Sequence, residues 1–236
     1  MKSKRFLIIG GGSGIGLASA TLLFAAGAKV IIAGRDQKRL QDARKLLGAE
    51  VEIVSLDIAD EENVVSAFAG LNQLDGIVCT GGHTPPGSIN DLTLNEAKRG
   101  FDSKFFGQYC VVKYGLKKMR DSGSFVLTSG VFAVRPTENV GVLAAVNGAI
   151  ESFVRAMAVE IAPMRINALA PGFIDTQRFK QISGKNPEAL AKVLKSKVPL
   201  QRVGTPVEAA EAVLYLLSNS YVTGTTLYID GGLAQR

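Results

Sequence analysis

Short apolar runs alternate with longer segments of mixed apolar and polar residues along the whole chain. Runs such as Phe6-Leu7-Ile8-Ile9 contain no polar residue, which is typical of a strand buried on both faces of a parallel sheet. The longer segments have helical composition, and two of them end at a glycine, Gly27 or Gly48. The pattern predicts strands at residues 6–9, 29–33, 51–56, 76–79, 123–128, 164–169 and 225–229, and helices at residues 17–26, 37–47, 61–69, 94–119, 142–162 and 206–217.

This alternation predicts an α/β fold with one domain over residues 1–236. The expected architecture is a Rossmann fold, a doubly wound parallel sheet of about seven strands with helices on both faces. One long segment without regular periodicity, residues 173–199, follows the end of a strand. Because ligands of open α/β sheets bind at the carboxyl ends of strands, we interpret this insert as a substrate lid.

Composition narrows the choice of partners. Hydrophobic residues make up 47% of the 236 residues, which is enough for one large core, and the net charge is +6. The Lys and Arg residues are scattered among acidic residues and form no basic stripe with interleaved aromatic residues. We therefore expect no nucleic-acid partner, and the positive charge suits an anionic cofactor.

No run of about 18 consecutive apolar residues is present, so we expect no membrane-spanning segment. The basic start, Met1 to Arg5, precedes a short apolar run that breaks into glycines, unlike a signal peptide. Cys79 and Cys110 lie in separate apolar runs and form no C-x-x-C pair, which predicts reduced thiols in a cytoplasmic protein. With a single histidine in the chain, no metal site is expected.

A glycine-rich turn connects the first predicted strand to the first helix. In such a turn Gly10 permits the tight bend, Gly14 lets the backbone approach a pyrophosphate, and Gly16 permits close packing of helix on sheet. Free N–H groups at the start of the helix then face the phosphates. The whole turn is the predicted phosphate site of a dinucleotide, formed by Gly10, Gly12, Ser13, Gly14, Ile15 and Gly16.

The end of the second strand indicates which dinucleotide is bound. Proteins that bind NAD usually carry an acidic residue there, whereas this chain has Gly34 followed by Arg35. The planar guanidinium of Arg35 matches a 2′-phosphate in shape and charge, and Arg39 lies one turn further along the helix. The alternatives are that Arg35 is merely solvated or that Asp36 serves the ribose. We favour NADP(H) over NAD(H).

Several motifs, in the same order along the chain, resemble those of the short-chain dehydrogenase/reductase family. The similar segments are Gly10-x-x-x-Gly14-x-Gly16, Leu56-Asp57-Ile58, Cys79-Thr80-Gly81-Gly82 (in which only the last glycine matches), Arg165 through Thr176, and Tyr221 through Gly232. The resemblance implies that Asp57 and Ile58 contact the adenine. It also implies that a second set borders the cofactor: Thr80, Gly81, Gly82, Pro171, Gly172, Ile174 and Thr176. The last motif implies a homodimer or a homotetramer.

The resemblance fails at the catalytic positions. Family members use a Tyr as acid or base, and a Lys one turn later that tunes the Tyr and holds the nicotinamide ribose. A Ser orients the substrate carbonyl, and an Asn supports a water. Aligned on the long helix at residues 142–162, the Tyr position holds Leu143 and the Lys position holds Asn147. The Ser position holds Gly130 and the Asn position holds Lys104, so all four are changed.

Three residues are candidate replacements. Lys104 is a candidate to stabilise an oxyanion or donate a proton, the alternative being a lysine that tethers a loop carbonyl. His83 follows Gly82 at the end of a strand. It is a candidate for proton transfer, the alternative being a loop histidine near the cofactor with no chemical role. Asn147 keeps hydrogen-bonding capacity toward the ribose hydroxyls.

Two functions remain. The first is an NADP(H)-dependent oxidoreductase that transfers a hydride to a small carbonyl or quinone-like acceptor with a non-standard proton donor, because the cofactor carries the difficult chemistry. The second is a catalytically inactive NADP(H)-binding sensor or assembly protein, which the changed catalytic positions favour.

Overall fold

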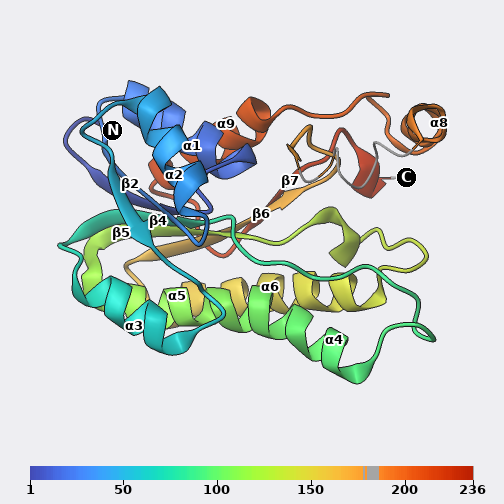
Figure 1. The fold of residues 1–236 in the computed structure, drawn as a ribbon, viewed down its shortest axis with the longest axis horizontal. Helices are drawn as coiled ribbons and strands as arrows, with labels where there is room; N and C mark the ends of the chain where they lie inside the picture. The colour runs from blue at the N-terminus through green and yellow to red at the C-terminus, as the bar shows by residue number, and fades with distance from the viewer. Residues whose placement is uncertain (178, 180–185, 236) are drawn as a thin grey trace.

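The computed structural model describes residues 1–177, 179 and 186–235. Its centre is a seven-stranded sheet in which every neighbouring pair is parallel, in the order β3-β2-β1-β4-β5-β6-β7 (Figure 1). The predicted α/β class and parallel sheet are confirmed. The strands are β1 (Arg5–Ile9), β2 (Lys29–Gly34), β3 (Glu52–Ser55), β4 (Leu74–Cys79), β5 (Met119–Thr128), β6 (Arg165–Pro171) and β7 (Thr226–Ile229).

Helices cover both faces of the sheet, as Figure 1 shows. One layer consists of α1 (Gly14–Ala25), α2 (Gln37–Leu47) and α9 (Pro206–Ser218). The opposite layer consists of α3 (Glu61–Ala69), α4 (Leu94–Gly100), α5 (Gly107–Gly115) and α6 (Gly141–Glu160). This arrangement is the doubly wound architecture that the strand and helix alternation predicts.

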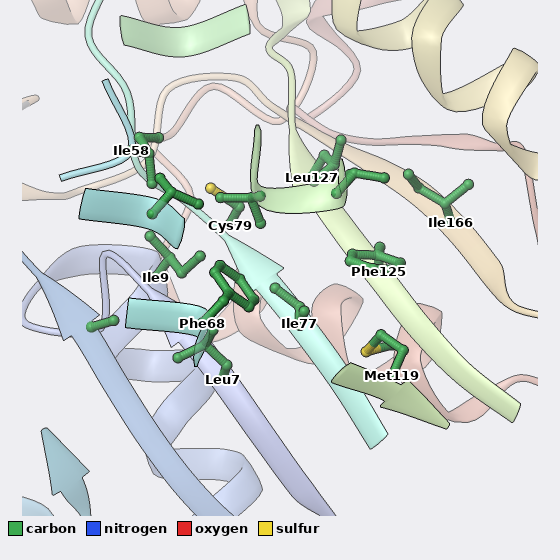
Figure 2. Packing of buried hydrophobic residues seen from close by; sticks show 14 of the residues in the cluster. Leu7, Ile9, Ile58, Phe68, Ile77, Cys79, Met119, Phe125, Leu127 and Ile166 are labelled. Carbon is green, nitrogen blue, oxygen red and sulfur yellow. The ribbon is translucent and has the colours of Figure 1, made fainter. Parts of the chain in front are cut away.

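Alternate residues of each strand supply two separate cores. In β1, Leu7 and Ile9 point toward the α3, α5 and α6 layer, whereas Phe6 and Ile8 point toward the α1, α2 and α9 layer. Figure 2 shows the first core, where Phe68 of α3 packs near β-strand side chains such as Ile77. Because both faces of β1 are buried, Phe6 to Ile9 are apolar throughout rather than alternating.

The chain reverses its direction of sheet growth between β1 and β4. It runs from β1 outward to β2 and β3, then returns to place β4 on the other side of β1. The carboxyl ends of β1 and β4 therefore border a crevice, the usual ligand position in this architecture. The glycine turn follows β1, and Thr80 follows β4, so both lie at this edge.

The predicted single helix over residues 94–119 is wrong in its interior and at its end. A π-helical segment, Phe101–Phe106, separates α4 from α5, a 3₁₀ turn covers Leu116–Lys118, and Met119 pairs with Leu74 in the sheet. A π-helical segment winds one extra residue into a turn, which an apolar periodicity does not reveal. Within α5, the Gln108 amide donates to the Thr128 carbonyl at 3.1 Å and accepts from its N–H at 2.9 Å.

Helix α6 bears on the expectation that the chain has no membrane-spanning segment. Among the described residues, this 20-residue helix alone is long and apolar enough by length and composition. In the fold it lies against β5 and β6, and Val146, Ile150 and Val154 are fully buried. This position is that of a core helix.

The predicted insert at residues 173–199 is not irregular throughout. Helix α8 (Pro187–Lys197) forms there, with Asn186 capping it by accepting from the Ala189 N–H at 3.0 Å. Residues 178 and 180–185 of the insert lie outside the described residues. Its role as a lid stays a prediction.

Candidate cofactor and active site

The glycine turn has the geometry that close backbone approach requires. Gly10 and Gly14 adopt positive φ angles of 84° and 53°, a conformation that side-chain-bearing residues rarely adopt. A Cβ on Gly16 would collide with the Gly10 carbonyl oxygen, so only glycine lets α1 start this close to β1. Behind the turn, the Thr80 hydroxyl donates to the Ile9 carbonyl at 3.0 Å. Thr80 thus fixes the turn to the end of β4.

A pocket of about 580 Å³ opens beside this turn at the carboxyl edge of β1, β2 and β4. Eight of the predicted cofactor residues line it: Gly10, Gly12, Ser13, Arg35, Asp57, Ile58, Gly81 and Gly82. Further lining residues include Gly34, Asp36, Arg39, and Ser103 of the π-helical segment, the last of which sequence reasoning missed. The combination of a glycine-rich turn, apolar lining residues and flanking cations fits a dinucleotide.

The cations of this pocket differ in their pairing. The Arg35 guanidinium is 69% exposed and lies 3.8 Å from the Asp57 carboxylate. Arg39 instead lies 3.1 Å from Asp36, which also caps α2 by accepting the Arg39 N–H. Asp36 is therefore engaged at the helix start, and Arg35 is the cation whose long contact leaves it most available to an incoming phosphate.

The segment after β6 reaches the glycine turn from the other side. A Cβ on Gly14 would lie 3.2 Å from the Thr176 Cγ2 atom, so Thr176 packs directly against the turn. Ile174 is buried and lines a second pocket of about 430 Å³ together with Phe173 and Tyr228. Of the predicted nicotinamide-side residues, Thr176 thus joins the first site, while the Ile174 side chain faces elsewhere.

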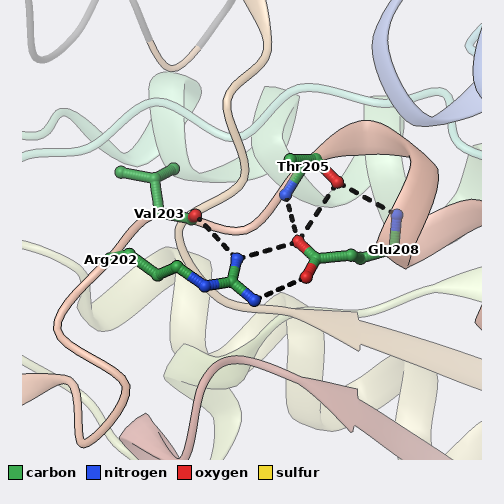
Figure 3. Close-up of polar contacts among 4 residues, drawn as sticks. All are labelled: Arg202, Val203, Thr205 and Glu208. Atoms are coloured by element: carbon green, nitrogen blue, oxygen red, sulfur yellow. Dashed lines mark hydrogen bonds and ion pairs between the residues drawn. The ribbon is translucent and has the colours of Figure 1, made fainter.

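The second pocket is bordered by a charged pair that joins Arg202, before α9, to Glu208 in the first turn of α9. Arg202 donates to both carboxylate oxygens of Glu208, at 3.0 and 2.6 Å, as Figure 3 shows. Glu208 also accepts from the N–H and hydroxyl of Thr205, completing a capping box at the start of the helix. Arg202 and these capping bonds lower the pKa of Glu208 to about 2.

Three of the four changed catalytic positions are in mutual contact. The Lys104 ammonium donates to the Asn147 Oδ1 atom at 2.6 Å and to the Ser129 carbonyl at 2.9 Å. Asn147 in turn donates to the Gly130 carbonyl at 3.3 Å. Lys104 is 9% exposed and Asn147 is 1% exposed, so this is a buried polar cluster. The carbonyl tether is one of the two roles that the sequence left open for Lys104.

The fourth changed position, Leu143, and the third candidate replacement, His83, are less suited to chemistry. Leu143 is half-buried on α6, four residues before Asn147, and has no titratable group. His83 is exposed, and its backbone N–H donates to the Ser103 hydroxyl at 3.0 Å. Among the described residues, no group of three or more His, Cys, Asp or Glu side chains is placed to hold a metal ion.

A second buried polar cluster was missed from the sequence. The Glu151 carboxylate, 6% exposed, accepts from the Ser129 hydroxyl at 2.7 Å and from the Tyr228 hydroxyl at 3.0 Å. Burial, reinforced by the negative charge of Glu151, raises the pKa of Tyr228 to about 12. The only sequence signal was the position of Glu151, four residues after Asn147 on the same helix face.

Fold and pocket together define a Rossmann-type dinucleotide-binding protein. A family model described as enoyl-(acyl carrier protein) reductase matches residues 10–234. The short-chain dehydrogenase/reductase ATR9 of Stachybotrys chlorohalonatus is 31% identical, with 98% of this chain and 97% of the relative covered. Carbonyl reductase family member 4 of Danio rerio is 30% identical, with 98% of each chain covered.

Solved structures of similar sequence have the same fold as this chain. A small-chain dehydrogenase in complex with NADPH is 31% identical, with a TM-score of 0.85 over 100% of both chains. A putative betaketoacyl-ACP reductase is 34% identical, with a TM-score of 0.88 over 99% of both chains. The chain belongs to the short-chain dehydrogenase/reductase family, a family of oxidoreductases that bind a nicotinamide cofactor.

Proposed function

We propose that the protein is an NADP(H)-dependent oxidoreductase that reduces a carbonyl or quinone-like acceptor. The observation that carries this proposal is the pocket beside the glycine turn, where Arg35 flanks the end of β2 and Asp57 the end of β3. The similarity to a dehydrogenase that binds NADPH supports the same cofactor. When bound, the cofactor supplies a hydride, and the acceptor oxygen takes up a proton.

The residues of this chain divide the work in the proposed reaction. The turn N–H groups bind the pyrophosphate, the Arg35 guanidinium binds the 2′-phosphate, and Asp57 and Ile58 border the adenine. Thr176, packed on Gly14, holds the nicotinamide half against the turn. Proton transfer does not pass through position 143, which is a leucine, and Lys104 is the ionisable candidate inside the cluster at Asn147.

The test of this function is oxidation of NADPH, followed at 340 nm, across a panel of quinones, diketones, aldehydes and ketones. We expect turnover with activated acceptors such as quinones and diketones, which need little enzymic proton donation, and weak or no turnover with simple ketones. NADH in the same assay is the matched control and is expected to be the poorer reductant. Tight NADPH binding without turnover of any acceptor would contradict the proposal.

A second function, an NADP(H)-binding sensor or assembly protein without turnover, is favoured by one observation. The three contacting replacements Lys104, Gly130 and Asn147 form a closed hydrogen-bonded cluster, and Leu143 cannot transfer a proton. A protein that binds NADP(H) without turnover needs no proton donor, and this cluster is compatible with that function. The acceptor panel separates this function from the first.

A further inference from the structure

We propose that Ser103 is a further cofactor-binding residue, whose hydroxyl donates a hydrogen bond to the adenosine half of the dinucleotide. The inference rests on the proposed NADP(H) site and adds to it a residue from the π-helical segment Phe101–Phe106, where the sequence predicts no cofactor contact. Ser103 lines the pocket beside the glycine turn, together with Gly10, Arg35 and Asp57. One wall of the pocket therefore comes from neither the turn nor the strand ends.

The π-helical segment is packed against the pocket on both sides of Ser103. A Cβ on Gly82 would lie 2.9 Å from the Lys104 Cα atom, and a Cβ on Gly107 would lie 2.8 Å from the Ile58 Cγ1 atom. Both distances are shorter than real Cβ contacts, so glycine at these two positions lets the segment approach closely. Gly82 and Ile58 are themselves lining residues of the pocket. The backbone that carries Ser103 is thus held at two points of the pocket wall.

Ser103 and its neighbour Lys104 face different surroundings. The Lys104 side chain is 9% exposed, and its ammonium donates to the Ser129 carbonyl at 2.9 Å. Ser103 is only half-buried and lines the pocket. A π-helical turn contains one more residue than an α-helical turn, so it changes which residues share a face, and such turns frequently occur at functional sites. The winding of this segment presents a hydroxyl to the pocket while it buries the adjacent ammonium.

The Ser103 hydroxyl keeps a donor function for a ligand. A serine hydroxyl can donate one hydrogen bond and accept two. Its oxygen accepts from the His83 N–H at 3.0 Å, which fixes that oxygen relative to the segment after β4. Among the residues that the structure describes, none accepts the hydroxyl proton of Ser103. Because Ser103 lines the pocket, that proton is available to a ring nitrogen, a ribose oxygen or a phosphate oxygen of a nucleotide.

The other lining residues indicate which part of the cofactor lies beside Ser103. In the proposed site, Asp57 and Ile58 border the adenine and Arg35 binds the 2′-phosphate, and these three residues line the same pocket as Ser103. The described residues predicted to border the nicotinamide, within 171–176, are not among its lining residues. The Ser103 hydroxyl is therefore assigned to the adenosine half and not to the nicotinamide half.

The experiment measures NADPH affinity by fluorescence for Ser103→Ala and Ser103→Thr. We expect Ser103→Ala to weaken NADPH binding roughly 3- to 10-fold, as for one lost uncharged hydrogen bond. Ser103→Thr keeps the hydroxyl and is expected to bind within about twofold of the unaltered protein. Ser66→Ala, at an exposed position of α3 that does not line the pocket, is the control and is expected to bind normally. A folded Ser103→Ala protein with unchanged NADPH affinity, or a Ser103→Thr protein that binds no better than Ser103→Ala, would overturn the proposal.

A cofactor fragment tests the assignment to the adenosine half. Adenosine 2′,5′-bisphosphate contains the adenine, its ribose and two phosphates but no nicotinamide. We expect Ser103→Ala to weaken binding of this fragment by the same factor as binding of NADPH, because both ligands lose the same hydrogen bond. Unchanged affinity for the fragment together with weakened affinity for NADPH would overturn the assignment.

A second pair of variants separates cofactor binding from the bond to the His83 N–H. His83→Pro removes that N–H and leaves the Ser103 hydroxyl in place. We expect Ser103→Ala to weaken NADPH binding by the same factor in the His83→Pro chain and in the unaltered chain, because the hydroxyl acts on the cofactor itself. Loss of the effect in the His83→Pro chain would show that Ser103 acts only by holding the segment after β4. If His83→Pro does not fold, the comparison with the fragment decides alone.

The binding measurements also distinguish this proposal from the proposed function. Binding is measured without an acceptor, so an absence of turnover leaves the outcomes readable. If the unaltered protein binds neither NADPH nor the fragment, the proposed cofactor site is wrong, and the assignment of Ser103 is wrong with it. If the unaltered protein and Ser103→Ala bind NADPH equally well, the cofactor site stands and only the assignment of Ser103 is overturned.

Discussion

Arg35 is the residue on which the proposed choice of NADP(H) over NAD(H) rests. Its guanidinium is largely exposed at the pocket edge and is 3.8 Å from Asp57, whereas Arg39 is engaged with Asp36. A guanidinium presents N–H donors in one plane, which suit the oxygens of a phosphate. A ribose hydroxyl is uncharged and would gain less from the positive charge of Arg35. The proposed function therefore assigns the distinction between NADPH and NADH to Arg35.

We expect Arg35→Ala to weaken NADPH binding roughly 10- to 100-fold and NADH binding less than about twofold, because only NADPH loses a charged hydrogen bond. Isothermal titration with both cofactors measures the ratio. Lys38→Ala removes an exposed charge of α2 that does not line the pocket, and it controls for general loss of positive potential. An equal effect of Arg35→Ala on both cofactors would show that Arg35 does not read the phosphate.

Single residues differ in how far the sequence reveals them. The positions of the glycine turn and Arg35 beside the pocket could be predicted because they depend on local spacing within one β-α-β unit. The Lys104–Asn147 contact joins residues 43 positions apart, and Glu151–Tyr228 joins residues 77 positions apart. Such pairs exist only because the sheet order places their elements together, so the missed hydroxyl of Tyr228 had no local signal.

Among the elements, α9 has the most explicit start signal. Thr205 is its N-cap, Pro206 occupies the first turn, and Glu208 closes the capping box while holding Arg202. Since Arg202 lies before the helix, the pair fastens the preceding segment to α9. Because the contact is exposed, salt screens its contribution to stability. That contribution also depends on pH, because Glu208 must be ionised to pair with Arg202.

We expect Glu208→Gln to lower the melting temperature at pH 7 and to change how stability depends on pH. Because the pKa of Glu208 falls from 4.5 to about 2 on folding, its stabilising effect is complete above pH 4.5 and is lost as the pH falls toward 2. The difference in melting temperature between the two proteins should therefore shrink between pH 4.5 and 2. Glu211→Gln, an exposed substitution in the same helix, is the control, and a difference that stays constant over this range would contradict the assignment.

The element predictions failed where a helix changes its winding. Residues 94–119 have a continuous helical pattern, but the π-helical segment and the 3₁₀ turn divide them. Within the π-helical segment, the Lys104 side chain bonds to Ser129 and Asn147. Those partners belong to other elements, so no property of the segment itself predicts the change.

At the scale of the whole molecule, the pocket beside the glycine turn is lined by residues from separate parts of the chain. The glycine turn, the ends of β2 and β3, the segment after β4 and the π-helical segment all line it, and Thr176 after β6 packs against the turn. A dinucleotide bound there contacts segments that unfolding separates. The proposed cofactor site is therefore formed by the fold as a whole and not by one loop.

We therefore expect NADPH to stabilise the entire fold. At a concentration of 100 times the dissociation constant, linkage contributes about 2.7 kcal/mol, which for a chain of this size corresponds to a rise in melting temperature of about 5 to 11 °C. Differential scanning fluorimetry with increasing NADPH measures the rise, and NADH at the same concentration is the control. A rise that does not grow with NADPH concentration would exclude specific binding to the native state.

The contact between Lys104 and Asn147 also constrains ancestry. A path that changes each position once, between the arrangement typical of the family and the arrangement here, passes through either two amides or two amines at the positions that are now in contact. Two ammonium groups in a buried site repel each other, whereas two amides can share hydrogen bonds. The lineage is therefore expected to have lost the lysine at 147 before it gained the lysine at 104, and present-day relatives of the intermediate type are expected to carry asparagine at both positions.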